Sequence, residues 1–155
     1  LTWIEPNRMT GKNVWLTKSS GQKWKSWCGY VFENLCISHI LQIKQALGIS
    51  GVLSEEAAWQ FTSDSSGDKG AQIDLLIDRN DQSINICEMK FTESEFVIDK
   101  RYASELQNKL AVFRQRTHTG KALFLMMVTA QGVKSNSYSQ ALVTNEVKLA
   151  QLFAD

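Results

Sequence analysis

The sequence predicts an α/β fold in which helices cover both faces of a mixed central sheet. Three features indicate this class. Apolar residues recur at three- and four-residue steps over residues 24–47, which is typical of an amphipathic helix. Two apolar strands flank a tight turn at 80–82, and residues 121–130, "KALFLMMVTA", form a continuous apolar run typical of a strand covered on both faces.

The first half of the chain predicts one helix and three strands. The helix is expected to start at Trp24 and to end at Gly48, a common helix stop. Residues 51–61 read as the first strand, before the turn-rich loop "TSDSSGDKGA". The second and third strands are expected at 72–79 and 83–91.

The second half predicts another helix and the last strands, which gives the order α-β-β-β-α-β. The helix is expected at 99–117, with Asp99 as its N-cap and an apolar stripe formed by Tyr102, Leu106, Leu110 and Phe113. After the run at 121–130, we expect a loop at 131–141, a short edge strand at 142–147 and a closing helical turn at "KLAQLF".

Length and composition fit one domain of 155 residues, expected to span 24–155. Residues 1–23 are aperiodic and are expected to be a linker or an N-terminal arm from a larger protein. No apolar run reaches the roughly 18–20 residues of a membrane span, and no signal-peptide pattern opens the sequence, so a cytoplasmic protein is expected. The three widely spaced cysteines are expected to be reduced and structural.

Charge is distributed unevenly along the chain. Residues 1–27 hold five Lys/Arg against one acid, and 99–121 hold six against two, whereas 50–98 are acidic. This pattern could present basic flanks to a phosphate backbone around a cation-binding centre, or it could be an ordinary solvated surface. The candidate groove residues are Lys100, Arg101, Lys109, Arg114 and Arg116.

Three charged residues lie within the most apolar pair of strands: Asp74, Glu88 and Lys90. A buried carboxylate is normally paired, hydrogen-bonded or bound to a metal, because an isolated one is strongly destabilising. If the 80–82 turn joins the strands directly, residues whose numbers sum to about 162 lie opposite each other, so Asp74 faces Glu88. A carboxylate-only ligand set favours Mg²⁺ or Mn²⁺.

Lys90 leaves its strand on the same face as Glu88, two residues away. Beside a metal, its ammonium could orient a water and stabilise charge on a phosphorus centre. The alternative is a structural ion pair of Lys90 with Asp74 or Glu88.

The block "ID", thirteen further residues and "EMK", on consecutive strands after a helix, resembles the PD-(D/E)xK nuclease superfamily. That resemblance implies a restriction-endonuclease-like three-layer sandwich. The blocks "WIEPNR", "GAQIDLLIDR" and "CEMKF" are more narrowly similar to the C-terminal nuclease-like domain of DUF234-type archaeal and bacterial AAA ATPases. The resemblance implies an N-terminal ATPase domain in the same chain, and it implies DNA and a second copy of the chain as candidate partners.

The resemblance implies that Asp74 and Glu88 bind Mg²⁺ or Mn²⁺, that Lys90 is the catalytic lysine, and that Glu33 in "GYVFENL" is a further metal ligand. A solvated helix glutamate is the alternative for Glu33. Ile73 replaces the family's proline before the aspartate. The expected function is DNA phosphodiester hydrolysis, and the alternative is an inactive DNA-binding, dimerisation or regulatory module of the ATPase.

Overall fold

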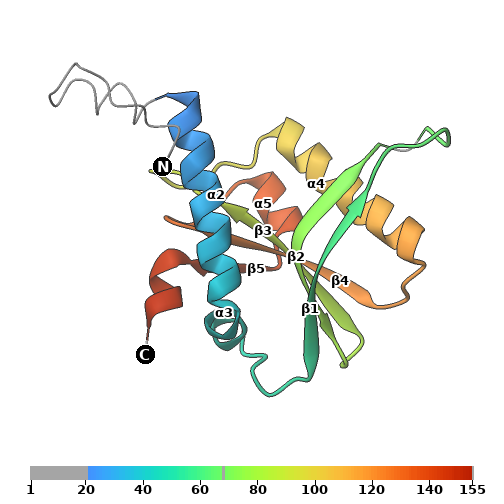
Figure 1. Ribbon diagram of the computed structural model, residues 1–155, viewed down its shortest axis with the longest axis horizontal. Helices are drawn as coiled ribbons and strands as arrows, with labels where there is room; N and C mark the ends of the chain where they lie inside the picture. The colour runs from blue at the N-terminus through green and yellow to red at the C-terminus, as the bar shows by residue number, and fades with distance from the viewer. Residues whose placement is uncertain (1–20, 68, 155) are drawn as a thin grey trace, which may run out of the picture.

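The structure is a computed structural model that describes residues 21–67 and 69–154, and its centre is a five-stranded mixed sheet (Figure 1). The strands lie in the order of the sequence: β1 (Ser54–Phe61), β2 (Ala71–Arg79), β3 (Ser83–Lys90), β4 (Ala122–Thr129) and β5 (Asn145–Lys148). The β1–β2 and β2–β3 pairs are antiparallel, and the β3–β4 and β4–β5 pairs are parallel. The α/β class and the mixed sheet are confirmed.

Helices cover the two faces of this sheet. On one face lie α2 (Gln22–Ser38), α3 (Ile40–Ala46) and the 3₁₀ helix η1 (Leu149–Phe153), and on the other lie α4 (Lys100–Thr117) and α5 (Ser137–Leu142). Figure 1 shows α2 crossing in front of the sheet with α4 behind it. The arrangement is a three-layer α/β sandwich, as expected.

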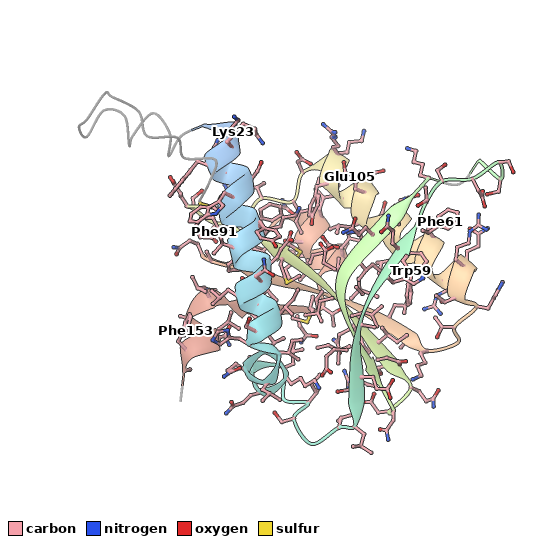
Figure 2. The ribbon with its side chains drawn as sticks, viewed as in Figure 1. Lys23, Trp59, Phe61, Phe91, Glu105 and Phe153 are labelled. Carbon is pink, nitrogen blue, oxygen red and sulfur yellow. The ribbon has the colours of Figure 1, made fainter. Side chains whose placement is uncertain are left out.

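Each face of the sheet has its own apolar cluster. Phe32, Cys36 and Ile43 pack on one face against Leu75, Cys87 and Val128, together with Leu152 of η1. Leu106 and Phe113 of α4 pack on the opposite face against Ile86 and Leu125. Because β4 contributes to both clusters, it is covered on both faces, as its unbroken apolar run predicts. Figure 2 shows Trp59 and Phe61 of β1 beside α4, and the Trp59 ring meets Phe113 edge-on.

The helix expected over 24–47 is two helices, and this prediction is corrected. It begins at Gln22 and is interrupted at His39, whose backbone leaves the helical region (φ −118°, ψ 32°). Nδ1 of His39 lies 2.8 Å from the carbonyl oxygen of Leu35. A side chain that bonds a carbonyl of the preceding turn competes with the backbone ladder, so the chain turns there before α3.

The loop expected at 131–141 contains a helix instead. The α5 helix starts after Asn136, which forms a reciprocal capping box with Ser139. The amide of Asn136 also donates to the carbonyl of Ile98, 2.9 Å away, so the cap is anchored to another part of the chain. Because this stabilisation is tertiary, a six-residue polar segment gives little helical signal by itself.

The β2–β3 hairpin has the predicted register. Leu75 pairs with Cys87 and Ile77 with Asn85, so the numbers sum to 162. The β1–β2 pairing, in contrast, shifts at β2. Ala57 pairs with Leu76 and Trp59 with Ile73, so the single residue Ala58 lies opposite both Asp74 and Leu75. This is a β-bulge, and sequence analysis did not predict it.

The predicted arm at 1–23 lies outside the described residues except for Gly21, Gln22 and Lys23, of which the last two belong to α2. In the described part of the chain, every helix is too short or too polar to cross a bilayer. Cys28, Cys36 and Cys87 are free thiols, as expected.

A candidate cation and nucleic-acid site

Glu88 is a buried carboxylate on β3 with both oxygens hydrogen-bonded. The residue is 7% exposed and leaves the strand on the α4 face, which it shares with Ile84 and Ile86. The hydroxyl of Tyr102 donates to Oε2 at 3.0 Å, and the ammonium of Lys109 donates to Oε1 in an ion pair. Helix α4 therefore supplies both partners of Glu88.

Tyr102 contacts two of the predicted site residues. Burial raises the pKa of its hydroxyl far above the ordinary value, and the adjacent Glu88 charge adds to the shift, so Tyr102 remains a proton donor. The ammonium of Lys90 lies over the same ring, 5.2 Å from its centroid. Such a cation–π contact holds the lysine charge in place.

Asp74 occupies the bulge of β2. Strict alternation would send residues three apart to opposite faces, yet Ile73 and Leu76 pack in the same α4-facing cluster. The extra residue of the bulge accounts for this, and bulges often redirect a side chain beside an active site. Asp74 is partly buried, and its Oδ1 accepts a hydrogen bond of 2.5 Å from the side-chain amide of Gln72.

Glu33 on α2 interacts electrostatically with all three predicted strand residues. Partial burial raises the pKa of Glu33, and the charges of Asp74 and Glu88 raise it further, while Lys90 lowers it. The charge of Glu33 therefore acts on this group from α2. Asp74 lies near the start of β2, and Glu88 and Lys90 lie at the end of β3, so these three residues share the end of the hairpin away from its turn, which we call the open end.

The chemistry of the donors fits a hard divalent cation, because Glu33, Asp74 and Glu88 offer only carboxylate oxygens. The three carboxylates are not, however, close enough together to bind one cation jointly in this structure. Within residues 21–67 and 69–154, no three Asp, Glu, His or Cys side chains come close enough to hold a metal ion. At Glu88 the positive charge is supplied by Lys109.

A cleft of about 1080 Å³ lies beside this group, between the start of β2 and α4. Lysine or arginine provides four of its ten lining residues, against one glutamate. The residues are Lys69, Gly70, Ala71, Gln72, Lys100, Arg101, Ser104, Glu105, Asn108 and Lys109. Glu105 marks this part of α4 in Figure 2. Gln72 and Lys109 connect the cleft to the open end, since they bond Asp74 and Glu88.

The five predicted groove cations divide into two groups. Lys100, Arg101 and Lys109 line the cleft. Arg114 instead donates to the carbonyls of Thr119 and Lys121, where it secures the end of α4. Arg116 does not line this cleft, contrary to the prediction. Its guanidinium lies over the Phe61 ring, 4.1 Å from the centroid, and pairs with Asp64 at 3.6 Å.

Sequence reasoning missed the roles of Tyr102 and Lys109. Tyr102 was assigned only to the apolar stripe of α4, and Lys109 only to the basic surface. Their spacing carried a usable signal, because residues seven apart lie two turns apart on one helix face.

No protein-family model matches the chain, and neither does any curated protein. Among solved structures, the chain is similar to AF1548, a protein of unknown function, with 12% identity and a TM-score of 0.47. The match covers 73% of this chain and 56% of that one. The function of the chain has to be inferred from its own side chains.

Proposed function

We propose that this domain is a nuclease that depends on Mg²⁺ or Mn²⁺ and hydrolyses phosphodiester bonds of DNA. One observation carries the proposal: Glu88 and Lys90 meet through Tyr102 beside a cleft rich in lysine and arginine, and Glu33 and Asp74 add acidic charge at this end of the hairpin. Crowded carboxylates raise the energy of a fold, and such groups are concentrated at functional sites.

Each residue has a distinct role in this proposal. Glu33, Asp74 and Glu88 are the residues that would hold the cation, and the cation when bound would lower the pKa of a water and offset charge on the phosphate. Lys90 orients the attacking water and stabilises negative charge on the phosphate oxygens, since its ammonium is positioned by the Tyr102 ring. Lys69, Lys100 and Arg101 bind the DNA backbone, a contact that carries no base specificity.

The resemblance to the DUF234-type ATPases extends the proposal to the protein's setting. The domain would act in the cytoplasm as the C-terminal part of a larger ATPase, with the ATPase domain and a second copy of the chain as candidate partners.

A second function has one observation in its favour. Glu88 already has a cationic partner in Lys109, as it would in a domain that binds DNA without cutting it. In that case the charges of the open end are structural ion pairs and hydrogen bonds.

Plasmid nicking separates the two functions. Purified wild type is incubated with supercoiled DNA and Mn²⁺, beside Asp74→Asn and a control, Asp78→Asn. Asp78 lies on the same strand and is paired with Lys121, far from the site residues along β2. The nuclease predicts nicking that falls by about 100-fold or more in Asp74→Asn and persists in Asp78→Asn. DNA binding without nicking by the wild type would favour the binding module.

A further inference from the structure

Lys109 is the one cation that both lines the cleft and bonds a proposed ligand residue, among the described residues. It donates to Glu88 Oε1, yet its side chain also faces the cleft alongside Lys69, Lys100 and Arg101. Glu88 itself does not line the cleft. The side chain of Glu88 is 9% exposed and that of Lys109 21%, and their ion pair links the lining of the cleft to the more deeply buried carboxylate.

The two partners of Glu88 differ in how easily they can move. Tyr102 is held by packing, because its ring stacks edge-on against Phe96 at 5.3 Å and lies beneath Lys90. Lysine has a flexible four-carbon stem and a compact charge, and can exchange one anionic partner for another. If Lys109 leaves, the Tyr102 hydrogen bond at Oε2 still orients the carboxylate.

We propose that Lys109 is an exchangeable counter-ion that couples nucleic-acid binding to cation binding. This inference rests on the function proposed above. Without nucleic acid, Lys109 neutralises Glu88. A backbone phosphate in the cleft draws the Lys109 ammonium toward itself, and Glu88 Oε1 becomes available as a ligand.

Coupling of this kind is reciprocal. If phosphate and Glu88 compete for Lys109, then nucleic acid strengthens cation binding and the cation strengthens nucleic-acid binding by the same factor. The Lys109–Glu88 pair also weakens the binding of a divalent cation to the protein without nucleic acid. The cation would therefore bind mainly in the complex with nucleic acid.

The test is a calorimetric titration of Mn²⁺ into DNA-free wild type, Lys109→Met and Lys100→Met. Lys100 is the matched control, because it lines the same cleft and carries the same charge without being paired to Glu88. Removing the competitor should tighten Mn²⁺ binding about fivefold or more in Lys109→Met. The Lys100 variant should change it less than about twofold, since a distant exposed charge is screened.

Other results would contradict the inference in distinguishable ways. If the wild type binds Mn²⁺ and Lys109→Met binds it no more tightly than Lys100→Met, the exchange is wrong and the proposed function stands. If no variant binds Mn²⁺, both are wrong.

A second measurement decides the matter if Lys109→Met does not fold. The affinity for a fluorescent DNA duplex is measured in EDTA for Glu88→Gln and Glu105→Gln, which remove the same charge from neighbouring positions. Glu105 lines the cleft and is paired with Arg101. Release of Lys109 predicts a several-fold larger gain for Glu88→Gln. Equal gains would overturn the exchange.

Discussion

Both ends of the β2–β3 hairpin carry charged side chains, but the two ends differ in how those charges are paired. At the turn end, Lys121 bonds Asp78 at 2.6 Å and the carbonyl of Arg79 at 2.8 Å. Arg79 in turn pairs with Asp81 and donates to the buried amide oxygen of Asn85 at 3.1 Å. Each charge at the turn end thus has a partner of opposite charge.

At the open end the acids outnumber their partners. Burial raises the pKa of Glu33, and the negative charges of Asp74 and Glu88 raise it further. Of these three acids, Glu88 forms a direct ion pair, with Lys109. The same two strands therefore combine an end where each charge has a partner of opposite charge with an end where Glu33 is surrounded by further acids, and the second is where a function is expected.

The largest expected difference between the ends is catalytic. Lys90→Met should reduce Mn²⁺-dependent nicking by about 100-fold or more, because an ammonium aimed at developing charge is lost. Lys121→Met removes the same charge from the turn end and should leave the rate within about twofold. Initial rates on supercoiled plasmid measure both. Equal losses in the two variants would remove the distinction between the ends.

The next difference is in stability. Glu88→Gln should lower the free energy of unfolding by about 1–3 kcal/mol, because a buried carboxylate loses the Lys109 ion pair. Asp78→Asn should lower it by less than about 1 kcal/mol, since its side chain is 46% exposed. Urea denaturation in metal-free buffer measures both values. A Glu88 variant as stable as wild type would show that this pair contributes nothing.

Replacing Glu33 should raise the free energy of unfolding, whereas replacing Glu88 lowers it, and the gain should depend on pH. The pKa of Glu33 is higher in the folded protein than its ordinary value of 4.5. The protonated side chain therefore favours folding when the pH is below 4.5, and this stabilisation is lost as the pH rises through the pKa of the folded state. At pH 7.5 Glu33→Gln should therefore be more stable than wild type by about 0.5 kcal/mol, from relief of like-charge contacts. Near pH 4 the two should converge. Urea midpoints across this pH range test the crossover, and a constant difference would contradict it.

The smallest effect is expected at the bulge. Asp74→Asn should raise the melting temperature in metal-free buffer by about 1–2 °C, since it relieves repulsion with Glu33 and keeps a group that can bond Gln72. Differential scanning calorimetry against Asp78→Asn provides the comparison. A clear fall in melting temperature would show that the Asp74 charge stabilises the fold.

Sequence patterns predicted most of the fold because its signals are local. Alternation and the turn at 80–82 placed the hairpin in its register, and the apolar run at 121–130 identified the doubly covered strand. The break at His39 and the capped α5 were missed, because they depend on a side chain bonding a carbonyl and on an anchor at Ile98. Such side-chain hydrogen bonds leave no trace in the periodicity of the sequence.

The arrangement of the candidate site residues could be predicted in part for the same reason. Asp74, Glu88 and Lys90 lie on adjacent strands, so a register alone places them near one another. Tyr102 and Lys109 reach Glu88 from a helix 14 and 21 residues further along the chain, and which face of that helix meets β3 follows from packing. The bulge at Asp74 likewise results from pairing with β1.

The most direct test of the cation site is a calorimetric titration of Mn²⁺ into wild type, Asp74→Asn and Asp78→Asn. We expect saturable binding by the wild type and by Asp78→Asn, and its loss in Asp74→Asn. Equal binding by all three proteins, or none by any at millimolar Mn²⁺, would contradict the assignment of the open end as a cation site.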